Sequence, residues 1–551
     1  MRTNILAALV LALGATAAVG QPAHVHGEEP KKAEAAPEPL VDDLGSHHRT
    51  VTTSSPEAQR YFDQGLRLLF SFNLEEAQQS FEEAARRDPE CAMCFWGVGM
   101  SLGPHINMPG MPDRTRAGHQ AAQKALALAK TSTPTEKALI EALAKRFSDP
   151  PPANPAGQSA LDTAYAEAMR GVLKRFPEDV DITVLTAEAL MDLHPWDLWT
   201  LQGEAQPWTA EIVTLLEQAL AKDPNHPGAN HYYIHAVEAS PHPEKALAAA
   251  GRVGALVPGA AHMVHMPSHI YARVGRWSDA SEANRQAIAV DRDYLGTASG
   301  LGFYFMYAAH NFQFLWFTSL MSGHGAVALE NARAVVSQAP VEMLQQMPGY
   351  DFLLGYPIWT LVPMGRWNEV LAEPAPPLGF PYVRAVWHGA RAIALMALGR
   401  EEEAVTERAS MVRVATEVPA EAMQGLNSAR TLLGIAVGIV DGRLAAARGM
   451  TDEAVERLRE AVRLEDTLRY NEPPDWYYPA LHDLGAVLAA AGQPVEAQTV
   501  WEEDLRRNPE NGWALAGLAE ALRGQQKEKD AAAVRERFEK AWKGADIPVR
   551  P

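Results

Sequence analysis

Segments in which apolar and polar residues are mixed in the way typical of helices recur along the chain. Each segment ends at a proline. The segments "FNLEEAQQSFEEAARRDP" at 72–89 and "AGQPVEAQTVWEEDLRRNP" at 491–509 are two of them. After the proline come two or three linking residues and then a new helical segment. No sustained alternation of apolar and polar residues bounded by turns is present, so strands are not expected. The pattern predicts an all-α protein.

The segments repeat at a fixed distance in part of the chain. From Pro224 to Pro258 is 34 residues, and the helix predicted after Pro258 is followed by "GRWSDASEANRQAIAVD" at 275–291. In that stretch Gly275 is a turn residue, and the tight part of a second helix begins at Ala280. Since a fixed period of this length indicates stacked supersecondary units, each period is predicted to contribute two helices.

This order of helix A, glycine turn, helix B and proline resembles the tetratricopeptide repeat (TPR) family. The resemblance covers most of residues 56–545 and is strongest at 56–103, 224–292 and 478–540. Gly65, Gly99 and Gly485 match the small residue at which helices A and B of the family cross. The resemblance implies an all-α, right-handed superhelical solenoid of TPR-like helix pairs, with the A helices lining a concave face and with loop insertions.

Three insertions interrupt the repeats, at 103–116, 149–160 and 194–208. Insertions in solenoids tend to lie on one face, often the binding face. His105, in the first insertion, is therefore a candidate ligand-binding residue. The repeats are expected to form an N-terminal part at 51–345, which carries the histidine-rich groove, and a C-terminal part at 346–545.

Histidines recur at the repeat period. In "GANHYYIHAVEAS" at 228–240, His231, His235 and Glu238 lie at steps of four and three, on one face of a helix. Adding 34 residues to the two histidines gives His265 and His269. In the TPR family these positions face the concave groove, and adjacent A helices pack about 8–10 Å apart. The resemblance therefore implies that four imidazoles converge between two helices.

Other side chains are candidates for the same site. His262 lies one residue into its predicted helix, but Pro267 either bends that helix or begins it. One repeat upstream, Glu188 falls at the level of His235 and His269. Downstream, His310 enters what resembles the next helix A. Arg273, four residues after His269, also suits the capture of an anionic ligand in the groove.

A cluster of imidazoles with a carboxylate suits a transition metal rather than calcium or magnesium. We place copper ahead of zinc and iron, because methionines lie among the histidines in "AHMVHMPSH" at 261–269. The first hypothesis is a metal-binding TPR scaffold with His231, His235, His262, His265 and His269 as ligands. A metal-dependent hydrolase or oxidase, with Glu188 or Glu238 as general base, is the second. A peptide- or protein-binding TPR adaptor without metal is the third.

The N-terminus predicts export. Arg2 and the apolar stretch "ILAALVLALGATAAVG" are followed by small residues, which indicates a signal peptide at 1–20. Residues 21–50 are predicted to form a disordered linker. No later segment is long and apolar enough to cross a bilayer. The mature protein is expected in the periplasm or outside the cell.

Charge and cysteine content narrow the remaining alternatives. The net charge of −19 leaves no basic face for a nucleic acid backbone. The two cysteines, Cys91 and Cys94, are not followed by a histidine, so their spacing does not match c-type haem attachment. An oxidising compartment favours a local disulfide between them, with metal ligation as the alternative.

Overall fold

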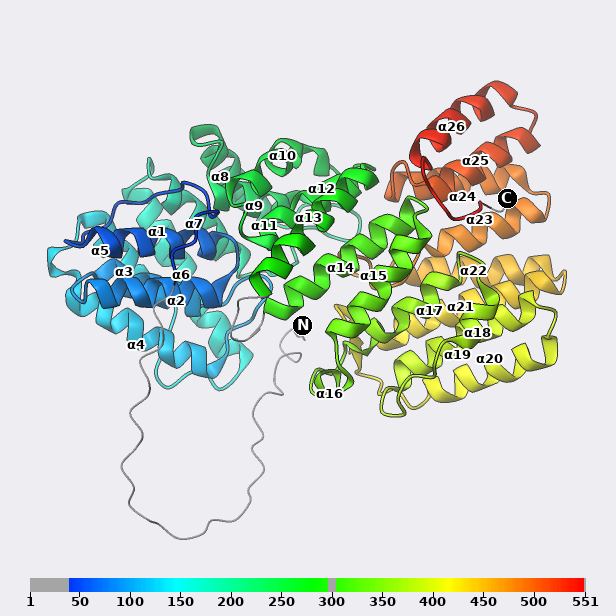
Figure 1. The fold of residues 1–551 in the computed structure, drawn as a ribbon, viewed down its shortest axis with the longest axis horizontal. Coiled ribbons are helices and arrows are strands. Elements are labelled where there is room, and N and C mark those ends of the chain that lie inside the picture. The colour runs from blue at the N-terminus through cyan, green and yellow to red at the C-terminus, as the bar shows by residue number, and fades with distance from the viewer. Residues whose placement is uncertain (1–38, 296–303, 550–551) are drawn as a thin grey trace, which may run out of the picture. The chain divides into compact units, whose positions relative to one another are not determined.

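The computed structural model describes residues 39–295 and 304–549, and the regular secondary structure of these residues is almost entirely helical (Figure 1). Within these residues the one β-sheet is an antiparallel pair of two-residue strands, β1 (Met423–Gln424) and β2 (Asn427–Ser428). The prediction of an all-α protein is confirmed. The signal peptide predicted at 1–20 and the predicted linker up to residue 38 lie outside the described residues.

Contacts divide the described chain into two compact units. The first covers residues 39–195 and 221–228, and the second covers 196–220, 229–295 and 304–549. The boundary expected between residues 345 and 346 lies inside the second unit. The helices that begin in the first part of the chain are α1 (Pro56–Phe70), α2 (Leu74–Arg87), α3 (Ala92–Leu102), α4 (Pro112–Leu128), η1 (Ala129–Thr131), α5 (Pro134–Leu143), α6 (Pro155–Arg175), α7 (Val180–Met191), α8 (Thr209–Lys222) and α9 (Pro227–Val237).

The second unit continues from α9 through helices of varied length. They are η2 (Pro243–Ala246), α10 (Leu247–Leu256), α11 (Ala261–His265), α12 (Pro267–Arg273), α13 (Trp277–Leu295), α14 (Tyr304–Met321), α15 (Gly325–Gln338), α16 (Val341–Leu344), η3 (Asp351–Gly355), α17 (Tyr356–Leu361), α18 (Trp367–Ala372), α19 (Pro381–Ala397), α20 (Glu401–Ala415), α21 (Ala429–Ala447), α22 (Thr451–Glu465), α23 (Ala480–Ala490), α24 (Pro494–Arg507), α25 (Gly512–Gly524) and α26 (Glu528–Ala541). Consecutive helices such as α19 and α20, or α21 and α22, pack against each other.

Glycines allow close packing within the helix pairs. A methyl group at Gly65 of α1 would lie 2.8 Å from the ring of Phe81 on α2. At Gly485 of α23, it would lie 2.4 Å from the indole of Trp501 on α24. Both glycines therefore occupy the crossing that the TPR resemblance implies. Gly99 of α3 instead faces Leu143 of α5, because the insertion after α3 lets α5 pack against it.

The chain before α1 packs on the first unit. Leu44 is 2% exposed, and the backbone N–H of Val41 donates to Gln64 of α1 at 2.8 Å. Arg49 donates to Asp179 at 3.0 Å and to Asp181 at 2.7 Å, at the start of α7. The last residues of the predicted linker, from 39 to 50, are thus held in place by buried apolar groups and ion pairs.

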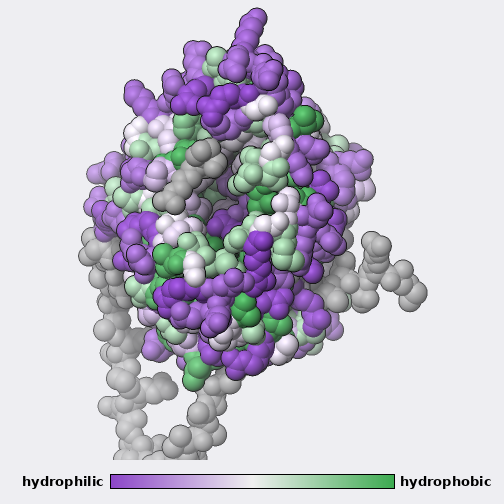
Figure 2. Space-filling view, turned by 90° about the vertical axis from the view of Figure 1, so that its right-hand side faces the viewer, coloured by the Kyte–Doolittle hydropathy of each residue, from purple (hydrophilic) through white to green (hydrophobic). Residues whose placement is uncertain are grey.

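Cys91 and Cys94 are joined by a disulfide at the start of α3, where the backbone N–H of Cys94 also donates to Cys91 Sγ at 3.1 Å. Among the described helices, none has the length and apolarity that a membrane crossing requires. Figure 2 shows that the face on the side of the C-terminal helices is mainly hydrophilic, with hydrophobic residues in small groups. The surface of that face therefore suits contact with water.

Candidate metal centre

Two short segments in the second unit carry five of the predicted ligands. His231 and His235 lie one turn apart on α9, while His262 and His265 lie on α11 and His269 on α12. The helix predicted after Pro258 is divided at Met266, and Pro267 begins α12. Proline is suited to the first turn of a helix because its missing N–H has no partner there in any case.

The structure brings these five histidines together. His231 Nε2 lies 3.1 Å from His262 Nε2, and His265 Nε2 lies 2.7 Å from His269 Nε2. The ring centroids of His235 and His269, which occupy equivalent positions one repeat apart, are separated by 5.7 Å. The repeat period thus places the two histidine pairs side by side.

Glu238, just after α9, holds two of the imidazoles. Its Oε1 accepts from His235 Nδ1 at 2.9 Å and its Oε2 accepts from His269 Nδ1 at 2.5 Å. Glu472, from the segment between α22 and α23, places Oε2 at 2.6 Å from the same His269 nitrogen. Glu238 therefore orients histidines, whereas the sequence offered it as a general base.

Asn284 of α13 fixes His265 in the same manner. The Asn284 Nδ2 donates to the carbonyl oxygen of Ala280 at 2.7 Å, so its Oδ1 accepts from His265 Nδ1 at 2.7 Å. His310 of α14 lies beside this pair, with its ring centroid 4.8 Å from that of His265. His310 Nδ1 lies 3.3 Å from Gln313 Oε1. His310, predicted as a ligand-binding residue, therefore joins the cluster.

Burial controls the charge of the imidazoles. His231 and His265 are fully buried, and His235, His262 and His269 are 6% exposed or less. Burial, together with the neighbouring histidines, lowers the pKa of His235, His262 and His265 well below the usual value. It also lowers the pKa of His310 to about 3. These four side chains are therefore neutral at pH 7, which is the form of imidazole that binds a metal.

His269 differs from the other imidazoles because two carboxylates adjoin it. Burial lowers its pKa, but Glu238 and Glu472 outweigh burial and raise the pKa to about 10. Burial and the nearby Glu238 raise the pKa of Glu472 to about 7. Without a metal ion, His269 thus carries the positive charge that balances the carboxylates.

The ligand atoms form groups of the size that a metal ion requires. His231, His235 and His262 place ligand atoms within 4.8 Å of one another, and His265, His269 and His310 do the same. Imidazole groups of three are used for zinc and copper. In such centres the other ring nitrogen commonly donates to a carboxylate or an amide oxygen, as His235, His265 and His269 do here.

The remaining predicted site residues have other neighbours. Arg273 donates to the backbone oxygens of Glu238 at 2.9 Å and Ser240 at 3.2 Å, so it holds the segment that carries Glu238. In the first unit, Glu188 pairs with Arg146 at 3.3 Å, and the ring centroid of His105 lies 4.3 Å from that of Phe72, with the two rings tilted.

Two members of the site were missed in the sequence. Glu472 lies 203 residues after His269, in the segment between α22 and α23. Asn284 lies on a B helix, and the repeat pattern gives its side chain no special role. Neither residue shares the 34-residue period of the histidines, so no signal in the sequence connects them with the cluster.

Two other features are less suited to a ligand. His47 and His226 both contact Asp181 Oδ1, but Arg49 occupies the other oxygen of this carboxylate at 2.7 Å.

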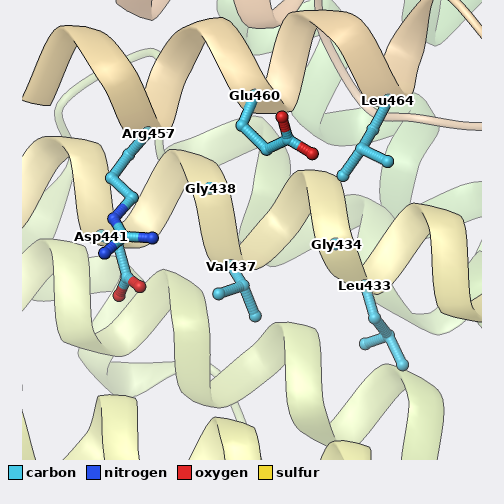
Figure 3. A pocket seen from close by; sticks show the side chains of 8 residues that line it. All are labelled: Leu433, Gly434, Val437, Gly438, Asp441, Arg457, Glu460 and Leu464. Atoms are coloured by element: carbon cyan, nitrogen blue, oxygen red, sulfur yellow. The ribbon is translucent and has the colours of Figure 1, made fainter.

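An open pocket of about 310 Å³ lies on α21 and α22 (Figure 3). Two acidic side chains of the pocket already form ion pairs with neighbouring arginines: Asp441 with Arg408 at 2.7 Å, and Glu460 with Arg463 at 2.9 Å. The pocket is lined by Leu433, Gly434, Val437, Gly438, Asp441, Arg457, Glu460 and Leu464.

The fold of the chain is similar to those of solved TPR proteins. A human IFIT1 dimer with m7Gppp-AAAA is 12% identical with a TM-score of 0.33, covering 89% of this chain and 91% of that one. Yeast Tom70 is 10% identical with a TM-score of 0.28, covering 88% and 92%. The TPR domain of P58(IPK) is 12% identical with a TM-score of 0.23, covering 86% and 99%.

No protein-family profile matches the chain, and no curated protein matches it. Structural similarity at this level carries no argument about a ligand or an activity. The helix pairs of the chain itself, with glycines at their crossings, are TPR-like. Arrays of such repeats serve as binding scaffolds. What this one binds is argued from the histidine cluster.

Proposed function

We propose that the protein is an exported TPR-like scaffold that binds a transition metal ion, copper ahead of zinc, through the buried imidazoles of α9, α11 and α12. The proposal is supported above all by the 2.7 Å approach of His265 Nε2 to His269 Nε2. On both rings the Nδ1 atom faces an oxygen acceptor, Asn284 Oδ1 or Glu238 Oε2.

These contacts dictate the chemistry of the pair. When Nδ1 carries the hydrogen of a neutral imidazole, Nε2 carries a lone pair. Two such lone pairs that face each other repel unless a cation lies between them. In the absence of metal, a proton on His269 supplies that cation. A metal ion replaces the proton and is bound by both nitrogens, with further imidazoles in reach.

The donor set supports a borderline or soft ion. Neutral imidazoles suit zinc and copper, whereas calcium and magnesium prefer oxygen ligands. Copper is placed first because Met263 and Met266, whose thioethers are soft ligands, alternate with the histidines in the chain. The signal-type N-terminus and the Cys91–Cys94 disulfide are consistent with export to an oxidising compartment.

The test is metal analysis of the protein purified without a histidine tag. We expect at least one equivalent of copper or zinc after loading and dialysis, and a higher melting temperature than that of the metal-free protein. The double substitution His231→Ala with His265→Ala, which removes one ligand from each histidine pair, should abolish both effects. His388→Ala is the control, because His388 pairs with Glu407 on α19 and α20 at 2.5 Å. Wild-type protein that retains no metal, or a double variant that retains it fully, would disprove the proposal.

A further inference from the structure

We infer that the centre holds two metal ions, one bound by His231, His235 and His262 and the other by His265, His269 and His310. This inference rests on the proposed function, since it concerns the number of ions in the same cluster. It would make the site a pair of adjacent three-imidazole centres.

Each group of three is compact on its own. In the first group, the ring centroids lie 5.0 Å apart for His231 and His235, and 4.9 Å apart for His231 and His262. In the second, they lie 4.7 Å apart for His265 and His269 and 4.8 Å apart for His265 and His310. Within each group one ligand atom per residue lies within 4.8 Å of the others.

Six imidazoles exceed the needs of one ion. Zinc takes four ligands in nearly all structural sites, and three protein ligands with an open position in catalytic ones. A single ion would leave two or three buried imidazoles without a metal. Two ions with three imidazoles each use all six, and each keeps a position for water or another small ligand.

The groups are neighbours and share one carboxylate. The ring centroids of His262 and His265, one from each group, lie 5.9 Å apart. Glu238 accepts from His235 of the first group and from His269 of the second, and Glu472 adjoins His269 as well. Buried cations require compensating negative charge. Glu238, beside both groups, and Glu472, beside the second, supply part of that charge.

The repeat explains why there are two groups. His231 and His235 on α9 supply a pair of ligands at a spacing of four residues, and His265 and His269 supply the same pair one period later. Each pair gains a third imidazole from another position, His262 of α11 or His310 of α14. Two half-sites of the same design thus lie on consecutive repeats.

The experiment is a zinc titration of the full-length protein, with bound metal counted after dialysis. We expect two equivalents for the wild type and for the control His388→Ala. His231→Ala should lose the first ion and His310→Ala the second, each leaving one equivalent. Circular dichroism checks that the variants fold.

The outcomes separate the two proposals. One equivalent in the wild type, unchanged in one of the two variants, would overturn the two-ion inference and leave the proposed function in place. No bound metal in the wild type would overturn both. Because the wild-type count needs no substitution, the inference is tested even if a variant fails to fold. In addition, Glu238→Gln should weaken both sites by about 10–100-fold, because Glu238 orients one ligand of each.

Discussion

Arg146 shows how a single buried charge is accommodated in the first unit. Its side chain is 1% exposed and donates to Asp192 at 2.7 Å, to Glu188 at 3.3 Å and to the backbone oxygen of Pro104 at 2.5 Å. Its guanidinium also lies 4.5 Å from the centroid of the Tyr165 ring. A charge that is buried away from water requires oppositely charged and hydrogen-bonding partners. Removal of one of these groups therefore destabilises the others.

Substitution of Arg146 by methionine should destabilise the first unit strongly. The change leaves two carboxylates, Glu188 and Asp192, buried without their cation, which costs about 3–5 kcal/mol of unfolding free energy. Denaturant unfolding of the metal-free protein measures it. As a control, Arg523→Met removes an exposed partner of Glu520 and should cost less than about 1 kcal/mol. Equal costs for the two substitutions would contradict this account of Arg146.

At the scale of elements, Asp475 connects the β1–β2 hairpin with the segment that precedes α23. It accepts from Asn427 Nδ2 at 2.7 Å, from the Leu426 N–H at 3.2 Å and from Asn471 Nδ2 at 2.6 Å. Burial outweighs these hydrogen bonds and raises the pKa of Asp475 to about 6. The hairpin is therefore fastened by a carboxyl group that holds its proton more tightly than an exposed aspartate does.

This shift predicts a pH dependence of stability. Because the pKa is raised on folding from 3.8 to about 6, the folded state binds the proton more tightly than the unfolded state. The contribution of Asp475 is greatest below pH 4 and is lost as the pH rises through about 6, by about 3 kcal/mol. As the pH rises from below 4 to above 6, the unfolding free energy of the wild type should therefore fall by this amount relative to that of Asp475→Asn. Asp530→Asn, at an exposed aspartate of α26, serves as the control substitution. A constant difference for Asp475→Asn would refute the assignment.

The helices around the metal centre show what the sequence predicted and what it did not. The 34-residue period aligned His231 with His265 and His235 with His269, and the structure places these residues together. The break at Met266 was one of two alternatives at Pro267, because a proline can bend a helix or begin it. Tertiary packing decides between these two alternatives, and the sequence around Pro267 alone does not specify that packing.

Across the whole molecule, regular repetition was easier to predict than contacts between distant residues. The succession of helix pairs follows from a pattern that recurs along the chain. By contrast, Glu472 reaches His269 from 203 residues away, and Asn284 reaches His265 from a B helix. The division into two units, with 221–228 in the first and 196–220 in the second, was likewise not predicted from the repeat pattern.

The two units should respond separately to metal. Every histidine of the proposed centre belongs to the second unit, whereas Arg146 and its partners belong to the first. A ligand stabilises the unit that binds it, by about 2.7 kcal/mol when its free concentration is 100 times the dissociation constant. In scanning calorimetry we therefore expect two transitions, of which metal raises only one. Arg146→Met should lower the other, and His231→Ala combined with His265→Ala should cancel the effect of metal while leaving the Arg146-dependent transition unchanged. A single transition that moves as a whole with metal and with Arg146→Met would show that the two units unfold together.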